Sequence, residues 1–458
     1  MLKTMKSREL VPNTKNLYES LINDSIGRGR SALEFVHMLD QINGHYSIAL
    51  DGQWGSGKTF FVNQIKMILD ALNPTLKMSD TYRDGILNWI DQMYGDFPPK
   101  RPAPSVSVIF DAWENDSDQD PLLSILNCIE DELHESFDQQ LNLNLCHAFE
   151  KIVDDIIPPL FKYSIAVITD IAKSVKDATP TSVIKSAYEL KSNVHQFIET
   201  LTDERGDRLV LFIDELDRCR PDYAIKTLER IKHYLLHDRV TVVFSTNIVQ
   251  LQHTVCNFYG QQFDAYNYLQ RFFDLNVTMP SYAEDEFYKI IDWKLQNDRY
   301  SQVCRAVMAH HHLSMRDIIR FSSLSEISEK ISSPRTHDFH DMAYKLEFAY
   351  IIPVAIGLKI TNINKYNQFV SGNAPDELWL AIRDQPRLYR PFFIDVDSSR
   401  MTDQDCLKRL CSQLYHAVFC HEYISDEEIV DIGQFSITYR SRYHIRQCLN
   451  VLNAYNFN

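Results

Sequence analysis

The chain has 458 residues, of which 45% are hydrophobic and 24% are charged, as in ordinary globular proteins of two or three domains. Its formal net charge of −15 excludes a generally basic surface that wraps nucleic acid, while a local basic face stays compatible with it. Its nine cysteines are dispersed without a C-x-x-C pair, which excludes a disulfide framework and indicates reduced thiols.

The most apolar stretch of the chain is Ile156–Ala172. It is shorter than the roughly 20 apolar residues that a membrane-spanning helix needs. It is also interrupted by Pro158, Pro159, Lys162 and Asp170. The N-terminal segment mixes charged and polar residues and lacks the apolar core of a signal peptide. We therefore expect a cytoplasmic protein without a membrane span.

The first predicted strand, Tyr46–Asp51, runs into a G-x-x-x-x-G-K-T sequence, and an amphipathic segment, Phe60–Leu72, follows. A strand, a glycine-rich turn and a helix in this order form a loop whose N–H groups cradle phosphates. We expect Lys58 to reach the β- and γ-phosphates and Thr59 to bind Mg²⁺. The sequence thus predicts a nucleoside triphosphate site formed by Gly52, Gln53, Trp54, Gly55, Ser56, Gly57, Lys58 and Thr59.

Four further apolar runs are predicted as strands, and helical segments separate them. They are Ser105–Phe110, Leu209–Asp214, Val240–Thr246 and Phe272–Val277. Most are nearly continuous in apolar residues, as in parallel strands that are covered on both faces. The predicted fold is therefore α/β: a doubly wound, mainly parallel five-stranded P-loop NTPase sheet, with a helical insertion and a helical C-terminal domain.

The domain organisation follows from the spacing of these runs. About 100 residues separate the second run from the third, far more than a crossover needs. We therefore predict a core of residues 1–120 and 204–280 with a helical insertion at 121–203. Helical periodicity then continues without further strands through a lid-like extension, 281–325, and a C-terminal domain, 326–458, of unassigned specificity.

The third predicted strand ends in two acids, Asp214 and Glu215, and Asp217 and Arg218 follow. In a P-loop enzyme an aspartate at this place holds Mg²⁺, and we assign that role to Asp214. The next acid can orient and activate the attacking water, so Glu215 is the predicted general base. The alternative is that these acids are solvated turn residues.

Three further residues are candidates for contacts with the transferred phosphate. Asn247 follows the fourth strand, where a polar side chain can reach the γ-phosphate or its water; Asn is also a common turn residue. Arg271 precedes the fifth strand and Arg316 opens a helix; either could contact phosphate in cis or in a neighbouring subunit, or lie on the surface. The segment Thr246–Gln250 lacks a guanine-reading motif, so ATP is the expected nucleotide.

Several separate motifs agree with one family. They are Asp24–Arg28, Gly52–Thr59 with its internal Trp54, Phe110–Glu114 with Pro121–Leu123 after it, Phe212–Cys219, and Tyr268–Arg271. Over about residues 20–325 the chain resembles the KAP family of P-loop NTPases, a branch of the additional-strand ATPases. Two positions depart from the family pattern: Glu215 stands where an aspartate is frequent, and Arg271 replaces a lysine.

The resemblance implies an intracellular, Mg-dependent ATPase, and bacterial members of this kind often resemble phage-exclusion or defence ATPases. We expect a nucleotide-driven switch that senses or controls a protein partner or effector, and we expect a homo-oligomer. Two alternatives stay open. One is a nucleic-acid motor or loader, which the charge of −15 does not favour. The other is a scaffold that binds ATP without turnover.

Weaker signals have simpler interpretations. His310–His312 could bind a metal but is more typical of an exposed helix start. His416 and Cys420 share a helix face, in a cluster with Cys411 and His421, which is too little to assign zinc. Tyr439–Arg446 interleaves aromatic and basic residues, as single-strand binders do, but a solvated amphipathic helix explains the pattern more simply.

Overall fold

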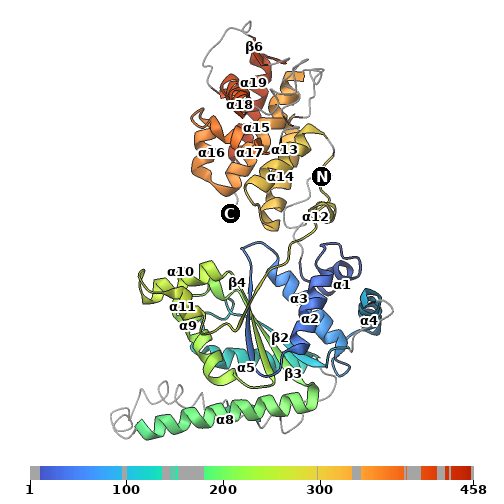
Figure 1. Ribbon diagram of the computed structural model, residues 1–458, viewed down its shortest axis with the longest axis vertical. Coiled ribbons are helices and arrows are strands. Elements are labelled where there is room, and N and C mark those ends of the chain that lie inside the picture. The colour runs from blue at the N-terminus through green and yellow to red at the C-terminus, as the bar shows by residue number, and fades with distance from the viewer. Residues whose placement is uncertain are drawn as a thin grey trace. The chain divides into compact units, whose positions relative to one another are not determined.

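The computed structural model describes residues 11–94, 101–136, 145, 148, 149, 151, 152, 180–296, 298–332, 342–385, 388, 404–419, 429–432 and 435–454. It divides the chain into two compact units, Leu10–Phe287 and a unit that contains Tyr288–Asn458 (Figure 1).

The first unit is built on one five-stranded sheet in which every strand pair is parallel, in the order β2-β3-β4-β1-β5. The strands are β1 (Tyr46–Asp51), β2 (Ser105–Asp111), β3 (Arg208–Asp214), β4 (Val240–Thr246) and β5 (Leu275–Thr278). This sheet confirms the predicted P-loop NTPase fold. Because the strands are parallel, all their carboxyl ends lie along one edge.

The fifth strand begins later than the sequence predicts. The expected run was Phe272–Val277, whereas β5 starts at Leu275. Phe272 closes a turn instead, because its N–H donates to the Leu269 carbonyl at 2.9 Å. Phe273 then packs its ring against Phe244 of β4, with 5.3 Å between centroids. Apolar character at these positions reflects core packing, which a hydrophobic run cannot distinguish from strand pairing.

Helices cover both faces of this sheet (Figure 1). Four helices before β2 pack together on one face: α1 (Thr14–Ile22), α2 (Gly29–Gln41), α3 (Lys58–Leu72) and α4 (Asp80–Tyr94). The other face carries α5 (Pro121–Ser136), α8 (Pro180–Arg205), α9 (Pro221–Arg230), α10 (Ile248–Tyr259) and α11 (Ala265–Leu269). The buried residues of these helices and strands form the core that fixes the sheet edge beneath the site.

The region predicted as a helical insertion, 121–203, is described at its two ends by α5 and α8. Between them, Phe149 is buried and packs against Phe197 of α8 with 6.0 Å between ring centroids. The apolar stretch Ile156–Ala172 lies outside the described residues. In the part of the chain that the structure describes, no helix is long and apolar enough to cross a membrane.

The second unit is mainly helical. Its helices are α13 (Arg299–His310), α14 (Met315–Ser332), α15 (Met342–Thr361), α16 (Ile363–Val370), α17 (Asp376–Ile382), α18 (Gln404–Phe419) and α19 (Tyr439–Ala454), and α12 (Glu284–Ile290) spans the division between the units. The central element is α15, which packs against α13, α14, α16 and α19. It is apolar around its whole circumference, as expected for a helix enclosed by others.

Two local features of this unit differ from the prediction. An antiparallel pair, β6 (Val430–Ile432) and β7 (Phe435–Ile437), stands where only helices were expected, because three-residue strands are too short to show alternation. His310–His312 ends α13 instead of opening a helix. No group of metal-ligating side chains occurs among the described residues, and Cys420 and His421 lie outside them.

Candidate nucleotide-binding site

The site lies where three neighbouring strands end. The loop Gly52–Thr59 follows β1, the pair Asp214 and Glu215 closes β3, and Thr246 ends β4. Register places Asp51 beside Thr246 and Asp214 beside Ser245 in the sheet. Parallel pairing therefore brings together segments that lie far apart in the sequence.

The phosphate loop, Gly52–Thr59, has the backbone geometry of an anion cradle. Gly57 has φ 84° and caps the N-terminus of α3, a left-handed conformation that glycine adopts without strain. A Cβ atom on Gly52 would lie 2.9 Å from Met279 Cβ, so this position also requires glycine. The N–H groups of Gly55, Gly57 and Lys58 have no acceptor among the described residues. These donors and the helix N-terminus suit a phosphate group.

Lys58 is held against the phosphate loop. Its side chain is 8% exposed, and Nζ donates to the carbonyls of Gly52 at 2.7 Å and Gln53 at 3.3 Å. Burial lowers the pKa of Lys58, and the nearby carboxylates of Asp217 and Asp214 oppose that shift. The Lys58 side chain is therefore positioned beside the N–H donors of the phosphate loop.

Thr59 and Asp214 meet across the sheet edge. The Thr59 hydroxyl donates to Asp214 Oδ2 at 2.6 Å, and Asp214 is 2% exposed. Burial raises the pKa of Asp214. Ser56 Oγ, in the same loop, is buried without a hydrogen-bond partner in the described ranges. A hydroxyl and a carboxylate at contact distance are oxygen donors of the kind that Mg²⁺ takes, so these residues fit the ion.

Glu215, the predicted base, has a left-handed backbone with φ 58°. Its carboxylate accepts a bond from Arg218 Nε at 2.5 Å. Burial raises the pKa of Glu215 to about 7, the Asp214 carboxylate adds to this shift, and Arg218 opposes it. The guanidinium of Arg218 also lies 5.5 Å from the ring centre of Trp113 in the loop after β2.

Asp217, for which the sequence predicted no role, also lies at this site. It is 6% exposed, and its carboxylate accepts hydrogen bonds from the Trp54 indole, from the Thr246 hydroxyl at 2.9 Å and from the Asn247 N–H at 3.2 Å. It thereby ties the phosphate loop to the end of β4. Its place in the Asp214–Asp217 segment was visible in the sequence, but its three partners were not.

The structure places Asn247 at the site as the N-cap of α10. Its side-chain oxygen accepts the Gln250 N–H at 3.2 Å, and its own N–H donates to Asp217. The carbonyl of this amide therefore stabilises the helix start. The NH₂ group is the part of the side chain that could face a phosphate.

Arg28, in the segment Asp24–Arg28, also supports the phosphate loop. It is 4% exposed, and its Nη1 donates to the Ser56 carbonyl at 2.8 Å. Its guanidinium lies 5.5 Å from the ring centre of Tyr282, and burial lowers the pKa of Arg28 to about 10. The segment Asp24–Arg28 therefore reaches the phosphate loop by side-chain contact.

Arg271 does not lie at this edge of the sheet. Arg271 lines a small cavity with His45 and Ser47, at the amino end of β1. Strand β1 is six residues long, which separates that end from the phosphate loop by about 16 Å. Arg271 is exposed and does not reach its own phosphate loop. Arg316 is exposed on α14 of the second unit.

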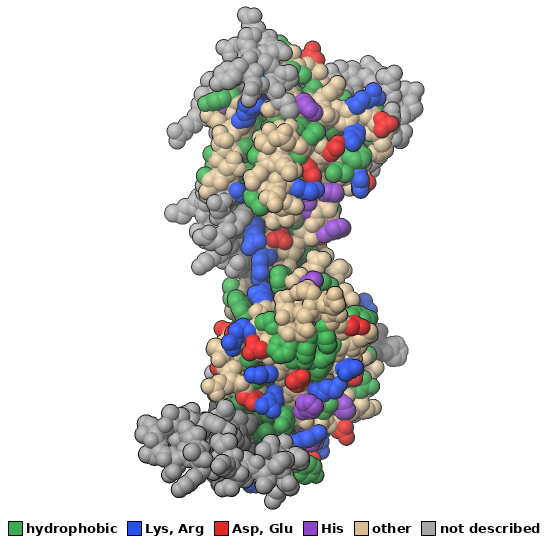
Figure 2. Space-filling view, turned by 90° about the vertical axis from the view of Figure 1, so that its left-hand side faces the viewer, with side chains coloured by type: hydrophobic (Ala, Val, Ile, Leu, Met, Phe, Trp, Pro, Cys, Tyr) green, Lys and Arg blue, Asp and Glu red, His purple; other side chains and the backbone are tan. Residues whose placement is uncertain are grey.

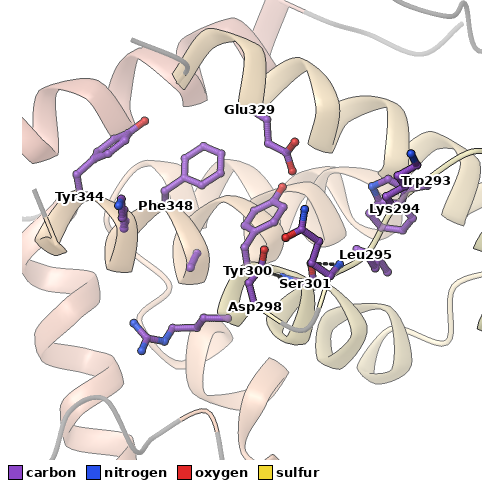
Figure 3. Close-up of a pocket in the computed structure, with 13 residues that line it drawn as sticks. Trp293, Lys294, Leu295, Asp298, Tyr300, Ser301, Glu329, Tyr344 and Phe348 are labelled. Carbon is purple, nitrogen blue, oxygen red and sulfur yellow. Dashed lines mark hydrogen bonds between the residues drawn. The ribbon is translucent and has the colours of Figure 1, made fainter. Parts of the chain in front are cut away.

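A cavity of about 590 Å³ occupies the second unit, and no predicted site residue lines it. Figure 3 shows Tyr344, Phe348 and Tyr300 along it, with the Glu329 carboxylate directed toward the Tyr300 hydroxyl. The Tyr300 and Phe348 rings stack with 5.2 Å between centroids. Lys294 and Glu329 both line it, so charge does not select one class of ligand.

The fold and the loop define a nucleotide-binding protein of the P-loop NTPase class. The sequence profile of the KAP family P-loop domain matches residues 30–330, more than half of the chain. The chain therefore belongs to the KAP family, which confirms the resemblance seen in its motifs. No curated protein matches it.

Proposed function

We propose that this protein is a Mg-dependent ATPase that works as a nucleotide-driven switch. The observation that carries the proposal is the meeting of Lys58, the Thr59–Asp214 pair and Glu215 at one sheet edge, with Thr59 Oγ1 and Asp214 Oδ2 2.6 Å apart. This set supplies a phosphate-binding cation, oxygen donors for a metal and a carboxylate base.

Each residue has a chemical task in this proposal. The loop N–H groups and Lys58 bind the phosphates and offset the negative charge that develops on the γ-phosphoryl oxygens. Mg²⁺, held by Thr59 and Asp214 when bound, would neutralise charge on the phosphate oxygens. Glu215 takes the proton of the attacking water as the oxygen bonds to phosphorus, and ADP leaves with the electron pair of the broken bond.

A switch needs a route from the nucleotide to the rest of the chain, and the segment after β5 supplies one. The Met279 N–H donates to the Asp51 carbonyl at 2.7 Å, directly before the phosphate loop. Arg28, which binds Ser56, also donates to the Ser281 carbonyl at 3.4 Å. The chain then enters α12 and the second unit. A change in the phosphate loop therefore acts directly on Met279 and Ser281, in the segment that leads into the second unit.

The arginine contacts of α19 do not favour the nucleic-acid alternative. Arg442 is 6% exposed, and Arg446 donates to the backbone carbonyls of Val418 at 3.3 Å and Phe419 at 3.1 Å. Because Arg442 is buried and Arg446 bonds to backbone carbonyls inside the unit, these two arginines do not form an outward basic stripe. A cytoplasmic location, a protein partner and a defence role stay predictions from sequence.

Two variants test the proposal. Lys58→Ala should weaken Mg·ATP binding at least tenfold, whereas Lys15→Ala, an exposed lysine on α1, should bind like the wild type. Glu215→Gln should bind ATP normally and lose at least 100-fold of the phosphate release rate. Normal ATP affinity in Lys58→Ala refutes the site. Binding without any release by the wild type supports the scaffold alternative.

A further inference from the structure

The surface of α10 and α11 carries an unusual concentration of exposed aromatic side chains. Phe258, Tyr259, Phe263 and Tyr266, hereafter the aromatic patch, are 47%, 43%, 36% and 58% exposed. Figure 2, which faces this side of the sheet unit, shows hydrophobic side chains gathered there. Monomeric proteins rarely leave so many large rings together in water, and such surfaces mark contacts with other proteins.

The aromatic patch is ordered by its own contacts. Tyr259 stacks on Phe263 with 4.5 Å between ring centroids and meets Phe258 edge-on at 4.9 Å. Tyr268, beneath them, contacts Tyr259 at 5.5 Å. Rings that are already packed lose little conformational freedom when a partner covers them, which favours binding.

The composition around the patch is that of an interface centre. Between Cys256 and Arg271 the only charged residues are Asp264 and Arg271. Interface centres are rich in aromatic residues and depleted in charge. If each ring has roughly 200 Å² of surface, the patch exposes about 400 Å², near half of the roughly 800 Å² that one side of a stable interface buries. The patch can thus form the core of such an interface but not all of it.

A surface of complementary character lies elsewhere in the same unit. The loop after β2 exposes Trp113, at 52%, and the adjacent Glu114. Among its acids, Asp116 and Asp120 already pair with Arg220 and Arg230, and Asp118 accepts a bond from the Ser124 hydroxyl at 2.7 Å. Glu114 is exposed and has no ion-pair partner among the described residues. Arg271 neighbours Tyr268, the ring beneath the patch, and its guanidinium makes no hydrogen bond or ion pair with the described residues. Trp113 and Glu114 of the loop thus match the aromatic patch and Arg271 in chemistry.

The two surfaces cannot meet within one chain. Strands β2 and β5 form opposite edges of the sheet. The Trp113 loop follows the carboxyl end of β2, whereas Arg271 precedes the amino end of β5. Contact between them requires two molecules, and a contact between different surfaces is head-to-tail.

We propose that a second copy of this chain docks its Trp113 loop on the aromatic patch. This inference rests on the proposed function in one respect, because it brings Arg271 of one copy toward the nucleotide site of the next. In that site Trp113 neighbours Arg218, whose guanidinium pairs with the Glu215 carboxylate. The receiving copy can offer its own patch to a third, so a ring or filament can grow.

Sedimentation velocity of the full chain over a range of concentrations, with Mg·ATP, tests the interface. The wild type should form dimers or larger assemblies. The double substitution Tyr259→Ser with Phe263→Ser, and separately Trp113→Ala, should each weaken association at least tenfold. Tyr188→Ser, which removes an aromatic residue that is 77% exposed on α8, should leave association unchanged. Unaltered ATP affinity in each variant shows that the sheet unit remains folded.

Mixing the variants separates head-to-tail contact from patch-to-patch contact. The patch variant keeps an intact Trp113 loop, and Trp113→Ala keeps an intact patch, so an equimolar mixture should form heterodimers at wild-type affinity but no larger species. The proposal is overturned if the mixture stays monomeric or if Trp113→Ala associates like the wild type. A wild type that hydrolyses ATP while remaining monomeric overturns the interface and leaves the proposed function standing.

Discussion

The bond between the Trp54 indole and Asp217 is expected to set the affinity for ATP. Asp217 accepts this bond with one carboxylate oxygen and bonds Thr246 and Asn247 with the other. Asp217→Asn keeps the shape of the side chain. Its single carbonyl oxygen can still serve Thr246 and Asn247, and its NH₂ group then faces the indole N–H. Two donors oppose each other, and the phosphate loop loses its tie to β4.

The magnitude follows from the kind of bond. A hydrogen bond to a charged group contributes about 1.5–3 kcal/mol, and because Trp54 is 45% exposed the lower end applies. About 1.4 kcal/mol corresponds to tenfold in affinity, so Asp217→Asn and Trp54→Phe should each weaken Mg·ATP binding about tenfold. In the double variant no indole N–H remains to oppose, so the loss should again be about tenfold and not hundredfold.

Titration calorimetry of Mg·ATP in the Glu215→Gln background measures these affinities without turnover. Trp113→Phe is the matched control, since Trp113 is 52% exposed and makes no bond to Asp217. A hundredfold loss in the double variant would mean that the two residues act independently. Wild-type affinity in Trp54→Phe would mean that Asp217 acts through β4 alone. Either result would refute the prediction that the Trp54–Asp217 bond sets the affinity for ATP.

Further predictions concern catalysis and stability. An Arg271→Ala chain mixed with a Glu215→Gln chain should regain ATPase activity only if the arginine acts across subunits; no recovery contradicts that role. Burial lowers the pKa of His311 to about 4, with His310 adding to the shift, so folding favours the neutral ring. The free energy of unfolding should be highest above about pH 6.5 and fall by about 2 kcal/mol toward pH 4, as urea denaturation can measure. Because burial also lowers the pKa of His310, His311→Gln should lose most but not all of this dependence, and the exposed His312→Gln should keep it. Phe212→Ala, at a fully buried site of β3, should lower the free energy of unfolding of the sheet unit by about 3–5 kcal/mol.

Local sequence patterns were sufficient to predict much of the site. Asp51–Thr59 shows a strand, a glycine turn and a lysine in sequence, and the apolar run before Asp214 predicts a buried strand whose end is polar. Both predictions depend on backbone requirements that are visible within a short segment of sequence. The start of β5 at Leu275 was missed because Phe273 packs in the core without pairing as a strand, and the hairpin β6–β7 was missed because three-residue strands are too short to show alternation.

The amino-acid sequence by itself determined which strands carry chemistry and which family the chain belongs to, because glycine, lysine and carboxylate positions are tied to local backbone geometry. Tertiary structure alone decided what lies next to what. It placed Asp217 between Trp54 and Thr246, and it moved Arg271 to the far end of β1. Strand order and direction determine these distances, and they arise from packing over the whole sheet, which no single segment encodes.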